Sequence, residues 1–185
     1  ANSNPTGFNQ VKDDIVVLYP KPTIWNTHCL TIFSENGKKL LQAFEDEEIS
    51  SYTDAIKVAI KHMDVNENER NIILSHQFVT GAIRSDSEEI SLGGTDNVDV
   101  CAYDSFDYVA LGHIHSPQKL VRDTVRYSGT PLKYSFSECR HNKSVTVVEM
   151  KEKGNVSITQ IPLVPMRDMV EIKGKYDEVM AKSFY

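Results

Sequence analysis

The sequence predicts an α/β fold, because short apolar runs of strand length occur together with an amphipathic helix and hairpin-forming segments. Two runs, Asn71–His76 and residues 107–112, are continuously apolar over most of their length rather than alternating. This pattern is typical of strands that are buried on both faces of a sheet. The chain has 185 residues, of which 40% are hydrophobic and 25% charged, a composition that can support a buried core.

Three further strands are expected in the first fifty residues, which are otherwise the hardest part of the chain to interpret. They cover residues 15–18, 28–33 and 39–44. The segment Ser34-Glu35-Asn36-Gly37 has the composition of a tight turn and would join the last two strands as a hairpin.

A helix is expected to follow, because apolar residues recur at steps of three and four and so form one apolar stripe. Ser50 or Ser51 can cap its first turn. Lys61 and His62 stand in its last turn, where basic side chains are favourable. The residues of the stripe are Tyr52, Ala55, Ile56, Ala59, Ile60 and Met63.

Two β-hairpins, a last strand and a final helix are expected after the second apolar run. Each hairpin consists of two strand-like segments separated by polar turn residues. In chain order, the expected elements are strands over 119–122 and 124–127 with a turn at Asp123, strands over 144–150 and 156–162, a strand over 169–172 and a helix from Lys175.

The composition argues against several classes of function. The net charge of −6 lacks the basic excess with which a protein surface usually grips duplex DNA, so we do not expect this chain to bind DNA on its own. Three widely spaced cysteines without a CxxC pair indicate neither a zinc ribbon nor a disulfide framework, but reduced thiols in a cytoplasm. No apolar run approaches the ~20 residues that span a bilayer, so no membrane segment is expected.

Histidines stand at the carboxyl ends of both buried runs. His76 ends the first run, and His113 and His115 follow the second. In open α/β sheets ligands bind beyond these strand ends, and residues two apart in an extended segment point to the same side. Gly112 would let the backbone turn sharply before the pair. Three imidazoles that converge there could hold Mn, Fe or Zn. Each histidine could instead be a hydrogen-bonded core or loop residue.

The segment Gly112-His113-Ile114-His115 matches the GHxH motif of the calcineurin-like metallophosphoesterases. Its surroundings resemble the SbcD-type nuclease subunits of that superfamily in particular. Three runs in the same order carry this resemblance, namely residues 73–79, 106–118 and 126–138. The likeness extends over about residues 70–185.

The resemblance implies a division into two domains. Residues 1–161 would form the second half of a metallophosphoesterase β-sandwich with flanking helices. Residues 162–185 would begin the small α+β C-terminal (cap) domain.

The chain has no initiator Met and no signal-peptide pattern at its start, and it stops within an expected element. We therefore expect it to be a piece of a longer protein.

The resemblance also implies two divalent metal ions, usually manganese, that grip a scissile phosphate. By resemblance, His76 and His113 would ligate one ion and His115 the other. These three histidines are the expected metal-ligating and catalytic residues. The family also has an Asp-x-His motif, a bridging Asp and a Gly-Asn-His-Asp motif, all of which lie upstream of the matched region, and none of them is in this chain.

Other segments do not replace the missing carboxylates. Asn26-Thr27-His28 has Asn where the carboxylate should be, His62-Met63-Asp64 is interpreted as a solvated helix end, and His141 as part of a polar loop. Asp107 lies at the wrong end of its strand, ~20 Å from His113. A catalytic metal typically takes three protein ligands. We therefore expect this chain alone to bind manganese weakly, if at all, and to be inactive as a nuclease.

For the whole protein, the resemblance implies a metal-dependent DNA exonuclease and endonuclease in DNA repair or recombination. It would work in the cytoplasm as a homodimer with an SbcC-like ATPase. Two alternatives stay open. One is a different metallophosphoesterase that acts on nucleotides or phosphoproteins. The other is a non-catalytic interaction module that binds an ATPase partner and whose histidines are structural.

Three further features are interpreted without a catalytic role. Gly93-Gly94-Thr95-Asp96 is expected to be a flexible loop, because no helix or Lys-Ser/Thr pair follows it. Lys133, Arg140 and Lys143 are expected to form a loose, solvated basic cluster. Half of a sandwich would leave a sheet edge and apolar surface uncovered, so self-association is expected.

Overall fold

The structure is a computed structural model that describes residues 8–12, 15–18, 26–30, 44, 46–63, 65–86 and 97–181. Several expected features lie outside the described residues: the end of the strand over 28–33, most of the strand over 39–44, the turn at 34–37, the loop at 93–96 and the last residues of the chain.

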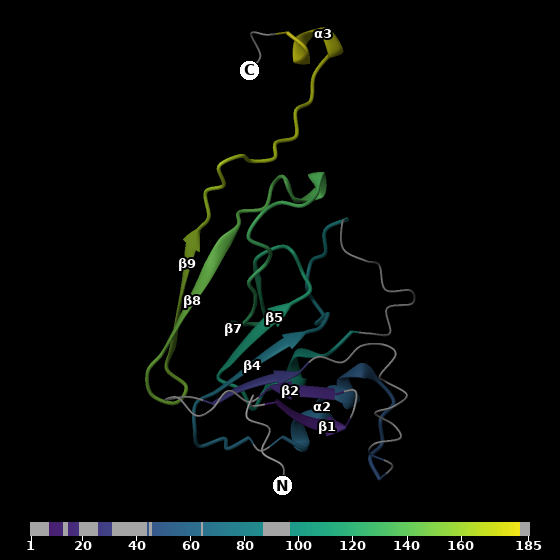
Figure 1. The fold of residues 1–185 in the computed structure, drawn as a ribbon, viewed down its shortest axis with the longest axis vertical. Coiled ribbons are helices and arrows are strands. Elements are labelled where there is room, and N and C mark those ends of the chain that lie inside the picture. The colour runs from purple at the N-terminus through teal and green to yellow at the C-terminus, as the bar shows by residue number, and fades with distance from the viewer. Residues whose placement is uncertain are drawn as a thin grey trace.

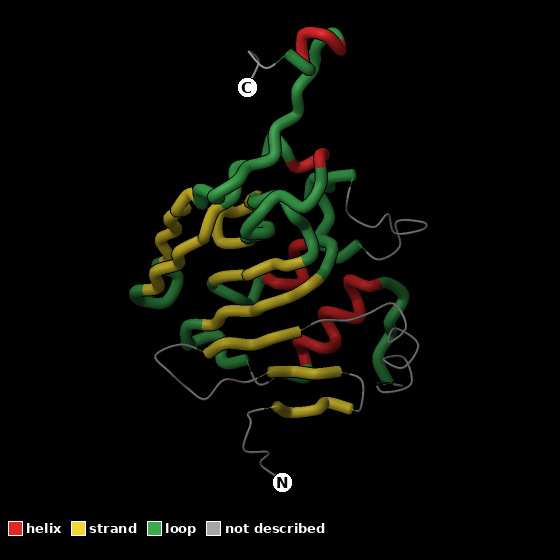
Figure 2. The backbone as a smooth tube through the Cα atoms, turned by 45° about the horizontal axis from the view of Figure 1, so that its top comes forward, coloured by secondary structure: helices red, strands yellow, loops and turns green. Residues whose placement is uncertain are grey.

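A five-stranded mixed sheet forms the centre of the chain (Figures 1 and 2). Its strands, in spatial order, are β3 (Asn26–Leu30), β4 (Asn71–His76), β5 (Tyr108–Gly112), β7 (Arg122–Tyr127) and β6 (Gln118–Leu120). The first four run parallel, and β6 pairs antiparallel with β7. The two predicted apolar runs are therefore neighbouring parallel strands.

The register of the sheet brings the carboxyl ends of three strands to one edge. His76 at the end of β4 lies opposite Gly112 at the end of β5. Leu111 in β5 lies opposite Tyr127 at the end of β7. Residues that follow these strands consequently meet at the same edge of the sheet.

The predicted helix is confirmed as α2 (Tyr52–Lys61). Of the two candidate caps, the Ser51 hydroxyl accepts a hydrogen bond from the Asp54 amide at 3.1 Å. Every residue of the predicted stripe is buried or partly buried, and the stripe joins the same hydrophobic cluster as the fully buried Ile73 and Val109 of the sheet. Burial of this face therefore fixes α2 on the sheet.

The β6–β7 hairpin is confirmed, but its expected turn at Asp123 is wrong. The chain turns at Val121, which has a positive φ of 21° and is 87% exposed. Arg122 already belongs to β7 and donates hydrogen bonds to the Asp104 carboxylate and the Tyr103 carbonyl, at 2.8 and 3.0 Å. These tertiary contacts outweigh the local turn preference of aspartate.

Two further pairs of strands form two-stranded antiparallel sheets. β8 (Ser144–Met150) and β9 (Val156–Pro162) have the predicted bounds and form one pair. β2 (Ile15–Leu18) was also predicted, whereas its partner β1 (Phe8–Lys12) was not. Two short 3-10 helices, η2 (Val100–Tyr103) and η3 (Phe136–Glu138), lie in the connecting loops.

Beyond β9 the chain leads away from the sheet to the short helix α3 (Tyr176–Val179) (Figure 1). The helix was predicted from Lys175, which is its N-cap, but the strand expected over 169–172 does not form. A strand needs a neighbouring strand whose backbone satisfies its N–H and C=O groups. In this segment the Val170 side chain is 66% exposed, and the carboxylate of the preceding Asp168 accepts a hydrogen bond from Lys133. The domain boundary between residues 161 and 162 stays a prediction.

The predicted α/β class is confirmed, and the assignment to half of a metallophosphoesterase sandwich stays a prediction. Within the described part of the chain, no helix combines the length and hydrophobicity that crossing a membrane requires. Cys101 and Cys139, whose side chains are described, carry free thiols.

Alkaline pH is expected to destabilise the fold through Tyr103. Burial raises the pKa of its phenol from 10.0 to about 12, although a hydrogen bond with Ser75 acts in the opposite direction. The folded state therefore holds this proton more tightly than the unfolded state, so stability is complete below pH 10 and falls as the pH rises toward 12. We expect a loss of about 1 kcal/mol at pH 11 in urea denaturation. Tyr103→Phe should lose less stability between pH 8 and 11, and equal losses in both proteins would contradict this prediction.

Candidate functional site

Two of the three expected histidines meet at the carboxyl edge of the sheet. His76 is the exposed last residue of β4, and His113 directly follows β5. Their ring centroids lie 5.4 Å apart, with the ring planes inclined at 77°. The parallel register thus brings together two imidazoles that are far apart in the sequence.

Gly112 is needed for a different reason from the one that the sequence suggested, namely to leave space between β4 and β5. A Cβ atom at Gly112 would lie 2.8 Å from Nδ1 of His76, so the ring of His76 occupies the place of a side chain there. The sharp turn lies at His113 itself, whose φ is 96°. Such a conformation is uncommon for a residue other than glycine and is typical of functional sites.

The same turn contradicts the extended segment that was assumed for His113 and His115. His115 is held in different surroundings: its Nδ1 lies 3.0 Å from Oε1 of Glu138, and its ring centroid 6.3 Å from that of Tyr134. Among the described residues, no group of three or more His, Cys, Asp or Glu side chains is arranged to hold a metal ion. The described part of the chain therefore offers a pair of imidazoles and a separately anchored third one.

The loop after β7 packs directly against the loop that carries His115. The amide of Thr130 donates a hydrogen bond to the carbonyl of His115 at 3.1 Å. Gly129 has a φ of 73°, and a Cβ atom there would lie 2.7 Å from the same carbonyl oxygen and from Pro117. Only glycine permits so close an approach of the two loops.

Beneath His115 lies a buried ion pair between Glu138 and Lys143. The Glu138 carboxylate is fully buried, and the Lys143 side chain is only 4% exposed. The ammonium group of Lys143 donates to Oε2 of Glu138 at 2.6 Å, to Oγ1 of Thr130 at 2.7 Å and to the carbonyl of His115 at 2.9 Å. Two buried charges are tolerated here because each is paired and hydrogen-bonded.

The charge of Glu138 is stabilised by this network. Burial on its own raises the pKa of the Glu138 carboxyl, but hydrogen bonds from Lys143 and His115 outweigh burial and lower the pKa to about 2. At neutral pH the group is therefore ionised and acts only as a hydrogen-bond acceptor.

The expectation of a solvated basic cluster is wrong for two of its three members. Lys143 is buried in the ion pair, and Lys133 donates to the carbonyl of Cys139 at 2.8 Å and to Asp168 at 3.0 Å. Arg140, with a side chain that is 85% exposed, is solvated as expected. His141, expected in a polar loop, is only 16% exposed and lies 4.0 Å from Glu138.

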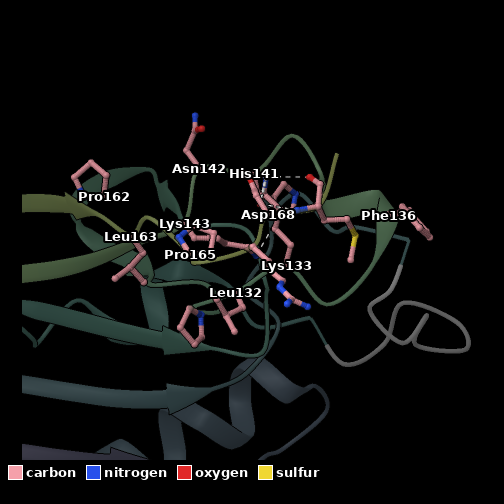
Figure 3. A pocket seen from close by; sticks show the side chains of 13 residues that line it. Leu132, Lys133, Phe136, His141, Asn142, Lys143, Pro162, Leu163, Pro165 and Asp168 are labelled. Atoms are coloured by element: carbon pink, nitrogen blue, oxygen red, sulfur yellow. Dashed lines mark hydrogen bonds and ion pairs between the residues drawn. The ribbon is translucent and has the colours of Figure 1, made fainter. Parts of the chain in front are cut away.

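An open pocket of about 390 Å³ adjoins this network (Figure 3). Lys133, His141 and Lys143 line it together with Asp168, and the apolar part of its wall includes Leu132 and Leu163. The segment that follows β9 thus closes one side of the pocket, next to the ion pair that supports His115.

The other candidate ligands have structural roles. His28 is buried, with Nε2 3.2 Å from Oδ1 of Asn71 and its ring edge-on to Phe106. His62 stacks on Phe44 at the end of α2. Asp107 lies at the amino end of β5, where its carboxylate accepts hydrogen bonds from the Asn71 amide and from Lys153 at 2.8 Å. The side chain of Asn26 and residue Asp64 lie outside the described residues.

The known proteins that are similar to this chain include two that carry the same name. No protein-family model matches the chain. It is 33% identical over 140 residues to the SbcD subunit of the SbcCD nuclease from Staphylococcus epidermidis, covering 74% of this chain and 37% of that protein. A protein of the same name from Staphylococcus saprophyticus is 33% identical over 175 residues, covering 92% of this chain and 46% of that protein. The chain spans less than half of the length of these relatives.

Replacing Gly112 by alanine is expected to disturb His76. The added Cβ atom would lie 2.8 Å from Nδ1 of His76, so the ring must shift from its place beside His113. Overpacking of this kind typically costs about 1–3 kcal/mol. Chemical denaturation and the NMR resonances of both imidazoles measure the two effects. Ser128→Ala, at the exposed position just after β7, is the control. If Gly112→Ala matched this control in stability and in both imidazole resonances, the close packing of the His76 ring on Gly112 would be disproved.

Replacing Glu138 by glutamine is expected to destabilise the chain strongly. The ammonium group of Lys143 would stay buried without an opposing charge, which typically costs about 3–5 kcal/mol. Glu171→Gln is a matched control, because that carboxylate is 41% exposed and its loss should leave the stability nearly unchanged. Equal unfolding midpoints for the two variants would show that the ion pair contributes little.

Proposed function

The chain belongs to the SbcD-type nuclease subunits, and on that premise we propose that it contributes the histidine half of a two-metal site in a DNA nuclease. The reaction would be hydrolysis of phosphodiester bonds in DNA, by exonuclease and endonuclease cleavage, in repair or recombination. The observation that carries the proposal is the meeting of His76 and His113 at the carboxyl ends of adjacent parallel strands, 5.4 Å between ring centroids.

The side chains at this edge fit a metal site in part. His76 and His113 would hold one divalent ion through imidazole nitrogens, and His115 would hold a second one. Two such ions, manganese being the expected metal, would supply Lewis acidity and an activated water for in-line attack on the phosphate. The turn at His113 would present its ring beside that of His76, and Gly112 would leave room for both.

The donor set among the described residues is incomplete, because no cluster of three ligand-type side chains is present there. A catalytic ion usually takes three protein ligands, and carboxylates are needed to offset the charge of two dications. We therefore propose that carboxylates from another part of the protein complete the site. On this view, the 185-residue chain binds manganese weakly, if at all, and does not cleave DNA.

The partners follow from the same premise. We propose that the whole protein acts in the cytoplasm as a homodimer with an SbcC-like ATPase. The net charge of −6 gives this chain no basic excess for gripping phosphates. DNA would therefore be held mainly by other parts of the assembly, while this chain supplies ligands at the reaction centre.

Manganese binding tests the proposal when this chain is compared with a longer protein in which Asp-x-His and Gly-Asn-His-Asp motifs, as implied by the family resemblance, precede it. Calorimetry should detect tight binding only for the longer protein, which alone should cleave DNA in a manganese-dependent manner. His76→Asn or His113→Asn in the longer protein should weaken both by more than the 10–100-fold that is typical of outer-shell residues.

His62→Asn is the matched control, because this histidine stacks on Phe44 at a helix end. Tight stoichiometric binding by the short chain would overturn the proposed incompleteness of its site. Metal-dependent hydrolysis of nucleotides or phosphoproteins without DNA cleavage would favour a different phosphoesterase. Binding to an ATPase partner with no metal requirement would favour a non-catalytic module.

A further inference from the structure

We propose that Glu138 and Lys143 are positioning residues that hold His115 at its ring and at its backbone, so that the ring binds a metal ion through Nε2. This inference rests on the proposed function and deepens it, because it assigns a task to two residues that are not themselves ligands.

The first support is the hydrogen bond between the ring and Glu138. Oε1 of Glu138 lies 3.0 Å from Nδ1 of His115. The other carboxylate oxygen accepts a hydrogen bond from the Lys143 ammonium group at 2.6 Å, so the carboxylate is paired as an anion and can only accept. The proton of a neutral His115 ring must therefore be on Nδ1, and the lone pair that a metal needs is on Nε2.

The second support is the hold on the backbone of the same residue. Lys143 has three N–H donors, and three close acceptors surround its Nζ: the Glu138 carboxylate, the Thr130 hydroxyl and the carbonyl of His115. The Thr130 amide donates to the same carbonyl from the loop after β7. His115 is thus fixed at two points, its carbonyl and its ring, by a single charged unit.

The cost of the ion pair makes a purely structural role a poor explanation. Burying two opposite charges gives up much hydration, and replacing such a pair with apolar side chains of similar size is often neutral or stabilising. The ion pair of Glu138 and Lys143 is costly, and its carboxylate contacts a ring nitrogen of His115. It therefore matches the carboxylate–histidine pairs that fix the tautomer of metal-binding histidines.

The tautomer of His115 provides a direct test that does not depend on activity. In the 15N-labelled chain at pH 8, long-range 1H–15N correlation should show that the neutral ring of His115 carries its proton on Nδ1. The signal is assigned by its absence in His115→Asn. The variant Glu138→Leu/Lys143→Met removes both charges together, so it should stay folded, and the Nδ1-protonated signal of His115 should be lost. Glu171→Gln should keep it.

A second readout separates this inference from the proposed function. In the longer, manganese-binding protein, the double variant should weaken metal binding by 10–100-fold, and Glu138→Asp with Lys143 intact should restore part of it. An unchanged His115 tautomer in the double variant would overturn the inference, as would a changed tautomer with unchanged metal affinity. Failure of the longer wild-type protein to bind manganese would overturn the proposed function instead, while the tautomer measurement still decides whether Glu138 orients His115.

Discussion

The parallel register between β4 and β5 is the constraint on which the candidate site depends. It places His76 opposite Gly112. The imidazole ring of His76 fits there because glycine has no Cβ atom to occupy the same space. The residue that directly follows β5 is His113, whose backbone turns with a positive φ and whose ring lies beside that of His76. A slip of one residue in this pairing would reverse the faces of the side chains and separate the two imidazoles.

Elements with a strong local pattern could be predicted from the sequence. The apolar runs predicted β4 and β5, and the stripe from Tyr52 to Met63 predicted α2. Two strand-like segments on either side of a polar turn predicted β8 and β9. In each case the spacing of apolar and polar residues along the sequence is enough to predict the element. The position of His76 and His113 at one edge followed from the same reasoning, because parallel strands end at the same edge.

What could not be predicted depends on contacts between distant segments. The turn at Val121 is set by the anchoring of Arg122 to Asp104 and Tyr103. Glu138 lay within a segment that resembles the SbcD-type subunits, yet nothing local distinguishes it from a solvated glutamate. Its role becomes visible only when Lys143 and the loop of His115 fold around it. The backbone turn at His113 is likewise invisible in a sequence that carries an ordinary histidine there.

The contacts of Lys133 connect the segment beyond β9 to the candidate site. Its ammonium group grips Asp168 of that segment, and it also holds the carbonyl of Cys139, the residue that follows Glu138. The segment that carries Asp168 is therefore linked to the loop of the third histidine through Lys133. The neighbouring residues Glu138 and Cys139 therefore hold the His115 ring and anchor the segment that follows β9.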